Sequence, residues 1–171
     1  PEAGISFALD ETLGTDARTT GIRADDRPVD VERYTLDIAE RGIRITGATP
    51  EGVFRGATTL LHLIAWGAED GTSSLPAMSI ADAPRFGWRG LSLDVVRTFH
   101  PVDTVKTVLD LLALYKMNVL HLHLTDAEGW RFPVPAYPHL TAISGQTARD
   151  GRPGGSYSEQ EYADILAYAA A

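Results

Sequence analysis

Short runs of alternating apolar and polar residues in the first third of the chain predict a small sheet. The alternation has a two-residue period in residues 34–40 and 42–49, and Gly42 at their junction indicates a hairpin turn. Residues 5–9 form a further short strand, and residues 75–86 return as an extended segment. We therefore expect strands that pair antiparallel around a central hairpin.

A single helix is predicted to cover this sheet. Residues 50–66 begin with a proline, which suits a first helical turn, and repeat apolar side chains at helical spacing. The Ala83-Pro84 step favours extended backbone and marks a boundary. Residues 1–84 are therefore expected to form a small α+β domain with an antiparallel sheet. The predicted buried face of its helix consists of Val53, Ala57, Leu60, Leu61 and Ile64.

After this boundary the pattern changes to strand, helix, strand, helix, which is typical of parallel βα units. The last helix opens with Ser158 and Glu161 at the spacing of a capping box. A loop of about thirty residues precedes it, and loops of such length at strand ends usually carry function. The four expected elements cover residues 91–97, 100–117, 118–126 and 158–170.

Each of these two predicted strands has one aliphatic face and one polar face, which is unusual for a parallel sheet. Ser92 and Asp94 form the polar face of the first strand, and His121 and His123 that of the second. The aliphatic faces must pack on the helices, so the polar faces should look into a barrel interior. On this pattern, residues 85–171 are expected to begin a barrel of parallel βα units.

Charge and composition exclude several classes of partner. The 171 residues carry a formal net charge of -8, so nucleic acid and anionic membrane surfaces are not expected partners. There is no cysteine, which excludes disulfides and thiolate metal sites and leaves the redox compartment open. No apolar run approaches the roughly 18 residues that span a bilayer, and the chain begins without the pattern of a signal peptide. Localisation is therefore undetermined.

Two charged residues stand at the predicted carboxyl ends of neighbouring strands, where barrels of this type build their sites. Arg97 either donates paired hydrogen bonds to vicinal hydroxyls, as sugar recognition requires, or pairs with a carboxylate such as Asp103. Asp126 is either a functional carboxylate or an aspartate that caps a turn. Asp126 and Glu128 are disfavoured as a self-contained acid and base, because two residues of one loop seldom face each other across a scissile bond.

Aromatic and imidazole side chains near these strand ends suggest further contacts. Trp130, and less so Trp88, offers a flat apolar face for a pyranose ring, although such side chains are more often part of a core. His121 and His123 resemble a pair of metal ligands, but no second cluster supports a metal site. We expect interior histidines bonded to Asp94, and neither a metal nor a cofactor.

The stretch from Trp88 to Thr141, WRGLSLDVVRTFHPVDTVKTVLDLLALYKMNVLHLHLTDAEGWRFPVPAYPHLT, closely resembles the opening of the catalytic domain in family 20 β-N-acetylhexosaminidases. Upstream, GATPEGVFRGATTLLHLI and LPAMSIADAPRF are similar to the end of the small α/β domain that precedes it. The resemblance implies that residues 85–171 are the first two βα units of a (β/α)8 TIM barrel, truncated because a closed barrel needs typically about 250 residues. It also implies an enzyme that cleaves terminal N-acetylglucosamine or N-acetylgalactosamine from β-linked glycans with retention. In this family the substrate's own 2-acetamido oxygen attacks the anomeric carbon and forms an oxazolinium intermediate.

The resemblance also implies roles for residues. An arginine after the first strand holds hydroxyls of the terminal sugar and corresponds to Arg97. An aspartate after the second strand supports the acid glutamate through a histidine and corresponds to Asp126. The family's consecutive Asp-Glu pair follows the fourth strand and would lie beyond residue 171, so this chain alone is expected to be inactive. Ala127 and Glu128 depart from the common form, in which a second acid and an amide are frequent.

Two alternatives to this interpretation stay open. The chain is also compatible with a carbohydrate-binding or interaction module that lacks catalysis. Within the enzyme class, a parent that releases disaccharides or specialises in chitin oligomers is the other candidate. In each case the expected partner is a glycan, in the leading interpretation one that ends in N-acetylhexosamine.

Overall fold

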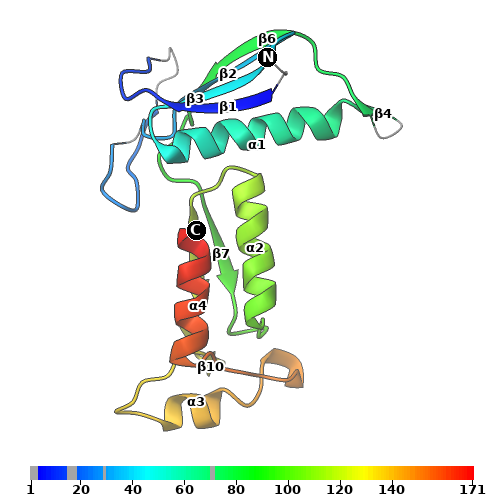
Figure 1. Ribbon diagram of the computed structural model, residues 1–171. Coiled ribbons are helices and arrows are strands. Elements are labelled where there is room, and N and C mark those ends of the chain that lie inside the picture. The colour runs from blue at the N-terminus through cyan, green and yellow to red at the C-terminus, as the bar shows by residue number, and fades with distance from the viewer. Residues whose placement is uncertain (1–3, 15–18, 29, 70–71) are drawn as a thin grey trace. The chain divides into compact units, whose positions relative to one another are not determined.

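The computed structural model describes residues 4–14, 19–28, 30–69 and 72–171. The chain divides into two compact units, Pro1–Arg89 and Gly90–Ala171, drawn from blue to green and from green to red in Figure 1. Both units combine strands with helices, as expected for an α/β protein. Within the described ranges, no helix combines the length and the apolar character needed to cross a bilayer.

The first unit is built on a four-stranded sheet. Antiparallel pairing of β2 with β3 confirms the predicted hairpin, and at its turn Gly42 has a φ of 132°. A Cβ atom on Gly42 would lie 2.5 Å from the carbonyl oxygen of Gly4, so only glycine fits there. The strands, in the spatial order β1-β3-β2-β6, are β1 (Gly4–Leu9), β3 (Gly42–Gly47), β2 (Tyr34–Ala39) and β6 (Met78–Asp82). Two short strands, β4 (Ala68–Glu69) and β5 (Thr72–Ser73), pair with each other.

The expectation of a wholly antiparallel sheet is wrong at β1, which pairs parallel with β3. Parallel neighbours require a connection of a dozen or more residues, and the chain between β1 and β3, residues 10–41 with β2 among them, is long enough to supply it. The apolar pattern of a strand carries no information about the direction of its neighbour. The sheet is therefore mixed.

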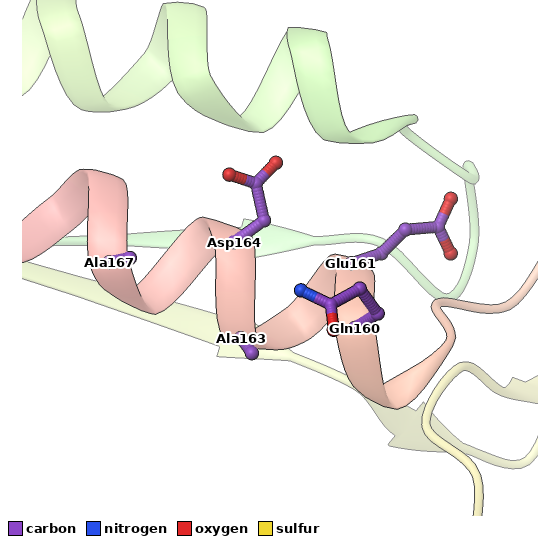
Figure 2. A pocket seen from close by; sticks show the side chains of 5 residues that line it. All are labelled: Gln160, Glu161, Ala163, Asp164 and Ala167. Atoms are coloured by element: carbon purple, nitrogen blue, oxygen red, sulfur yellow. The ribbon is translucent and has the colours of Figure 1, made fainter.

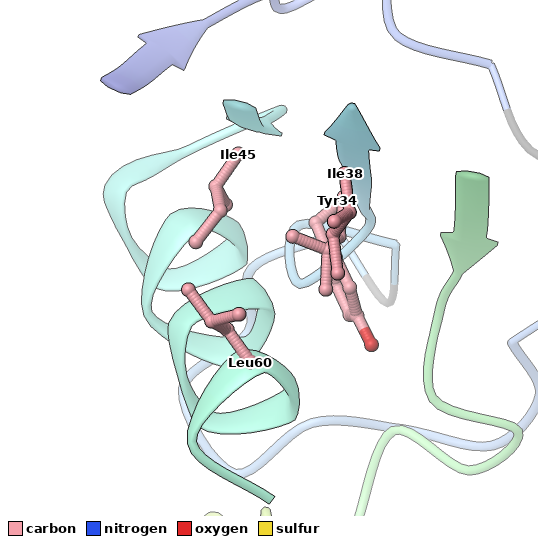
Figure 3. Packing of buried hydrophobic residues seen from close by; sticks show 5 residues of the cluster. Tyr34, Ile38, Ile45 and Leu60 are labelled. Carbon is pink, nitrogen blue, oxygen red and sulfur yellow. The ribbon is translucent and has the colours of Figure 1, made fainter. Parts of the chain in front are cut away.

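Helix α1 (Pro50–Trp66) covers one face of this sheet (Figure 1). The Thr49 hydroxyl accepts a hydrogen bond from the Gly52 N–H and caps the amino terminus of the helix. The helix approaches the sheet closely at Gly56, where a Cβ atom would lie 2.5 Å from the Ile45 side chain. Helix and sheet share one core (Figure 3), formed by Tyr34, Leu36, Ile38, Ile45 and Leu60.

The buried face of α1 differs from the predicted one. Leu60 is 5% exposed, whereas Leu61 and Ile64 expose 54% and 36% of their surface. Successive residues are separated by about 100° around a helix, so Leu61 turns away from the sheet when Leu60 faces it. The partly buried helix residues that pack on the core are Val53, Ala57 and Leu63.

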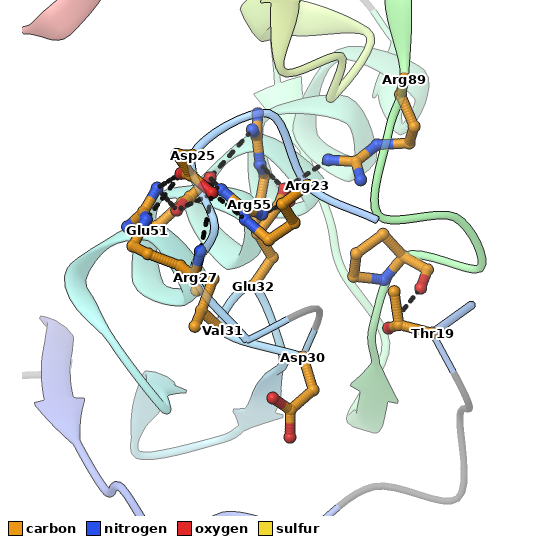
Figure 4. A network of polar contacts seen from close by, with 12 residues as sticks. Thr19, Arg23, Asp25, Arg27, Asp30, Val31, Glu32, Glu51, Arg55 and Arg89 are labelled. Atoms are coloured by element: carbon orange, nitrogen blue, oxygen red, sulfur yellow. Dashed lines mark hydrogen bonds and ion pairs between the residues drawn. The ribbon is translucent and has the colours of Figure 1, made fainter. Parts of the chain in front are cut away.

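A cluster of charged side chains is buried in the first unit (Figure 4). Glu32 is fully buried, and its carboxylate accepts hydrogen bonds from Arg23 Nη1 at 2.5 Å, from Arg55 Nε at 2.6 Å and from Arg89. A buried carboxylate requires such partners, because an unpaired charge in the interior is very costly. Since Arg89 directly precedes Gly90, the cluster ties the last residues of the first unit to its core.

The second unit contains two parallel strands, as predicted, joined by a helix. These elements are β7 (Gly90–Asp94), α2 (Val102–Leu114) and β8 (Val119–His123). Downstream lie β9 (Thr125–Asp126), β10 (Gly129–Trp130), α3 (His139–Ser144), a 3-10 turn (Arg149–Gly151) and α4 (Glu159–Ala170). Helix α4 begins at the predicted capping box of Ser158 and Glu161. It packs beside α2 (Figure 1), where Lys106 Nζ lies 2.7 Å from Asp164.

Both strands of the second unit end earlier than predicted. The first, expected over residues 91–97, stops at Asp94, whose side chain bends the following residues into a turn. The second, expected over residues 118–126, stops at His123, and the chain then folds back as the β9–β10 hairpin. Side chains that bond to nearby backbone groups, such as that of Asp94, compete with strand pairing.

The aliphatic strand faces and the helices form the core of the second unit. Leu91 departs from the prediction, because 42% of its surface is exposed. On the polar face, Ser92 Oγ lies 3.3 Å from His121 Nδ1. The buried core residues are Val95, Val105, Tyr157 and Ile165, and Leu93, Leu120, Leu122 and Leu124 pack against them.

Candidate functional site

The carboxyl ends of β7 and β8 meet at one edge of the second unit. The two strands run parallel in a register that pairs Asp94 with His123. Arg97 follows the first strand and Asp126 follows the second, and Arg97 Nη2 lies 2.8 Å from Asp126 Oδ2. The structure thus brings together the two residues that strand-end position had singled out.

A tight turn after β7 holds Arg97. Asp94 Oδ1 accepts hydrogen bonds from the N–H groups of Val96 and Arg97 at 2.9 and 3.0 Å, and Asp94 Oδ2 accepts one from Arg97 Nη1 at 2.8 Å. Desolvation raises the pKa of Asp94, but these hydrogen bonds outweigh it and hold the pKa below its ordinary value. One ionised carboxylate therefore fixes both the main chain and the side chain of Arg97.

Three carboxylates surround the guanidinium of Arg97. Besides Asp94 and Asp126, Glu128 Oε2 lies 3.1 Å from Arg97 Nε. The hydrogen bond to Asp94, followed by the contacts with Glu128 and Asp126, raises the pKa of Arg97. The sequence left open that Arg97 pairs with a carboxylate such as Asp103; it does pair with carboxylates, but with these three. About a third of the Arg97 side chain, 35%, stays exposed and accessible to a ligand.

The β9–β10 hairpin presents Asp126. Its Oδ1 accepts the N–H of Ala127 and its Oδ2 lies 2.7 Å from His123 Nε2, and both contacts lower the pKa of Asp126. An ionised carboxylate only accepts hydrogen bonds, so Nε2 of His123 carries the proton. The expected bond from the histidines to Asp94 is wrong: His123 pairs with Asp126, and His121 lies against Ser92.

The arrangement suits ligands that carry hydroxyl groups. A hydroxyl both donates and accepts hydrogen bonds. Arg97 supplies donors, while Asp126 and Glu128 supply charged acceptors beside it, and hydrogen bonds to charged groups are stronger than neutral ones. Sequence reasoning weighed Glu128 as a catalytic acid or base and as a departure from the common form of the family. It missed the pairing of Glu128 with Arg97, which depends on the fold of the hairpin.

The two tryptophans considered as sugar platforms occupy different units. Trp130 lies in β10, four residues beyond Asp126, and is partly buried; its indole N–H donates to the carbonyl of Phe132 at 2.5 Å, which fixes the ring. Trp88 belongs to the first unit and exposes half of its surface. Trp130 is therefore the tryptophan that the hairpin holds near the strand ends.

Arg131 is a buried residue that sequence reasoning missed. Its side chain is fully buried and donates only to main-chain carbonyls, including those of Val95 and Val96 in the turn that leads to Arg97. The available signal was an arginine inside the apolar run GWRFPVP, because a charge in such a run needs specific partners.

A hollow lies along α4 and is lined by residues of that helix (Figure 2). Its acids have other partners, because Glu161 caps the helix and Asp164 pairs with Lys106. In the part of the chain that the structure describes, no three His, Cys, Asp or Glu side chains gather as metal ligands. The residues that line the hollow are Gln160, Glu161, Ala163, Asp164 and Ala167.

Two family models match nearly the whole chain. The model described as "Glycosyl hydrolase family 20, catalytic domain" matches residues 86–171, and the one described as "Glycosyl hydrolase family 20, domain 2" matches residues 2–83. A β-N-acetylhexosaminidase from Cellulomonas fimi is 43% identical over 148 residues, which are 86% of this chain and 30% of that protein. An N,N'-diacetylchitobiase from Vibrio harveyi is 38% identical over 81% of this chain and 17% of its own length.

Solved structures agree with these matches. A glycoside hydrolase family 20 β-N-acetylglucosaminidase superimposes with a TM-score of 0.79 at 41% identity over 97% of this chain and 30% of that one. The Streptomyces plicatus N-acetyl-β-hexosaminidase in complex with thio-NAglucal gives 0.79 at 37% identity, over 97% of this chain and 31% of its own. The chain thus spans less than a third of these relatives. It belongs to glycosyl hydrolase family 20, and its two units match the models of that family's domain 2 and catalytic domain.

Proposed function

We propose that the protein containing this chain hydrolyses terminal β-linked N-acetylglucosamine or N-acetylgalactosamine from glycans. The main observation that supports this proposal is the position of the Arg97 guanidinium. It lies at the ends of two parallel strands, beside the carboxylates of Asp126 and Glu128. The names of the relatives support the reaction, and one matching structure, from Vibrio harveyi, is titled as a complex with N-acetylglucosamine.

The proposed mechanism is retaining and substrate-assisted. The 2-acetamido oxygen of the sugar attacks the anomeric carbon and forms an oxazolinium ion, which water then opens. Within it, Arg97 holds hydroxyls of the terminal sugar and Trp130 supplies an apolar ring face. Asp126 has a supporting role: it orients Arg97 and, as the resemblance implies, acts through a histidine on the acid glutamate. The acid and the acetamido-orienting aspartate are not assigned to residues of this chain.

We infer that residues 1–84 form the small domain and residues 85–171 the first two βα units of a (β/α)8 barrel. The parallel β7 and β8 joined by α2, and the match to the catalytic-domain model, support this assignment. A barrel of this type needs eight strands. We therefore expect that the 171 residues alone do not hydrolyse glycosides.

Chromogenic substrates test the function. A protein that joins this chain to a complete family 20 catalytic domain should release p-nitrophenol from the β-N-acetylglucosaminide or the β-N-acetylgalactosaminide. It should leave the β-glucoside intact, because that sugar lacks the attacking acetamido group. The first product detected by NMR should be the β-anomer. Equal turnover of the glucoside, or an α-anomer as first product, would refute the proposed mechanism.

The same assay on the 171-residue polypeptide separates the enzyme from a binding module. If the longer protein is inactive while both bind N-acetylglucosamine, the chain is part of a carbohydrate-binding module. Turnover by the 171 residues alone would contradict the expectation that they are inactive.

A further inference from the structure

We propose that Arg131 is a positioning residue that holds the turn bearing Arg97 and so fixes the guanidinium that receives the terminal sugar. This inference rests on the proposed function for its consequence in catalysis. The holding of the turn itself is a property of the fold and is tested separately below.

The Arg131 side chain is 0% exposed, and every N–H of its guanidinium has an acceptor. A guanidinium has five N–H donors, and all five are used here. The acceptors are main-chain carbonyls: Val95 O at 3.1 Å, Val96 O at 2.5 Å, Ser144 O at 3.3 Å, Thr147 O at 3.0 Å and Gly155 O at 3.0 Å. Arg131 thus joins the turn after β7 to the segments before and after the 3-10 turn.

The main chain of Arg131 adds two further ties. Its N–H donates to the carbonyl of Leu124 at 2.9 Å, directly after β8, and its carbonyl accepts the N–H of Tyr157 at 2.8 Å, directly before α4. The Tyr157 ring lies 5.2 Å from that of Phe99, two residues beyond Arg97. One residue therefore connects the end of each strand with the beginning of α4.

The connection to Arg97 runs through the main chain on both sides. Arg131 binds the carbonyls of Val95 and Val96, the two residues before Arg97. The carbonyl of Arg97 accepts the N–H of Arg149, and Arg149 lies two residues beyond Thr147, which Arg131 also binds. The Arg97 main chain is thereby held between two segments that share Arg131 as their common donor.

Only arginine fits this position. A lysine ammonium has three donors on a flexible stem and cannot serve five carbonyls in a planar fork. Burial lowers the pKa of Arg131, but arginine starts from so high a pKa that it stays charged. Five carbonyl dipoles, rather than a carboxylate, are its hydrogen-bonded partners. Arg131 is therefore unlike Arg97, whose partners are carboxylates that a substrate can also contact.

The test compares Arg131→Lys and Arg131→Met with Arg97→Ala in the protein that carries a complete catalytic domain. The control is Arg23→Met, which removes another buried arginine, from the charged cluster of the first unit. Hydrogen exchange at the Val96 and Arg97 amides reports the turn directly. We expect exchange there to become about tenfold faster or more in both Arg131 variants and to stay unchanged in Arg23→Met.

Steady-state kinetics then test the consequence for the sugar. Arg131→Lys should raise KM by about tenfold or more with a smaller change in kcat. In the Arg97→Ala background, Arg131→Met should cause little further loss of kcat/KM, because the effects of residues that act through one another do not add. Arg23→Met should lower thermal stability and leave kcat/KM of the folded protein unchanged.

Each outcome decides the inference. Unchanged exchange at the Val96 and Arg97 amides in Arg131→Lys overturns it. It is also overturned if the loss of kcat/KM in Arg131→Met adds in full to the loss in Arg97→Ala. If Arg131→Met does not fold, the lysine variant carries both measurements. If the protein cleaves no N-acetylhexosaminide, the proposed function fails, while the exchange measurement still decides whether Arg131 holds the turn.

Discussion

Arg97 Nη2 lies 2.8 Å from Asp126 Oδ2, although the two residues follow different strands and are separated by the whole of α2. This contact exists because β7 and β8 run parallel and therefore end at the same edge. It places a cation and an anion side by side where a ligand can approach them.

Replacement of Arg97 by alanine should lower kcat/KM for a chromogenic N-acetylglucosaminide by roughly 100-fold, because charged hydrogen bonds to sugar hydroxyls are lost. Arg97→Lys should recover only part of this loss, since an ammonium cannot donate two parallel hydrogen bonds. Arg44→Ala, an exposed arginine of β3, is the matched control and should behave as wild type. An unchanged kcat/KM in Arg97→Ala would remove this residue from the site.

Asp126→Asn separates two roles of this carboxylate. If Asp126 only orients Arg97, KM rises while the pH profile of kcat stays in place. If it also acts through a histidine on the acid glutamate, loss of the negative charge lowers the pKa of that acid. The alkaline limb of the kcat profile then moves to lower pH. Asp110→Asn, on the exposed side of α2, controls for the loss of one surface charge.

Glu32→Gln should destabilise the first unit by about 3–5 kcal/mol at neutral pH, because three arginines lose their shared buried partner. Burial raises the pKa of Glu32, but Arg55 and Arg89 outweigh it and hold the folded-state pKa below 4.5. Its stabilising effect is therefore present above about pH 4.5 and lost as pH falls through the folded-state pKa.

Hydrogen exchange of the core amides of Leu36 and Ile45 measures this effect locally. As the pH is lowered, the protection of these amides against exchange should fall less steeply in Glu32→Gln than in wild type. Asp30→Asn, which removes an exposed partner of Arg33, should change stability by less than about 0.5 kcal/mol. Identical acid profiles for wild type and Glu32→Gln would contradict the proposed contribution of Glu32.

Gly155→Ala should destabilise the second unit by about 1–3 kcal/mol through overpacking. A Cβ atom at Gly155 would lie 2.3 to 2.6 Å from three carbons of the Phe99 ring. Gly14→Ala is the control, because a Cβ atom there meets nothing within 4 Å. Thermal unfolding measures both variants. Equal melting temperatures of Gly155→Ala and wild type would show that the Phe99 ring moves aside without a loss of stability.

Local signals account for the elements that were predicted well. Pro50 begins α1, the capping box of Ser158 and Glu161 begins α4, and the two-residue alternation around Gly42 predicts the β2–β3 hairpin. Each signal involves side chains that contact their own backbone or their near neighbours in the sequence. Such contacts form in the same way wherever the segment sits in the fold.

Pairings between distant segments were not predictable in this way. β1 pairs with β3 in parallel, and no pattern within β1 records which strand becomes its neighbour or in which direction that strand runs. The first strand of the second unit ends where the Asp94 side chain bonds to the backbone of the following turn, and the second ends where the chain folds back as the β9–β10 hairpin. The exposure of Leu61 depends on the orientation of α1 over the sheet.

The sequence by itself determined the order of the longer elements and the candidate pair, because the ends of apolar runs locate Arg97 and Asp126 near strand tips. Only the tertiary structure decided which groups surround that pair. Glu128 reaches Arg97 because a hairpin folds back, and Arg131 collects carbonyls from residues between Val95 and Gly155. Hydrogen bonds act over about 3 Å, so residues far apart in the sequence become partners only when the fold brings them together.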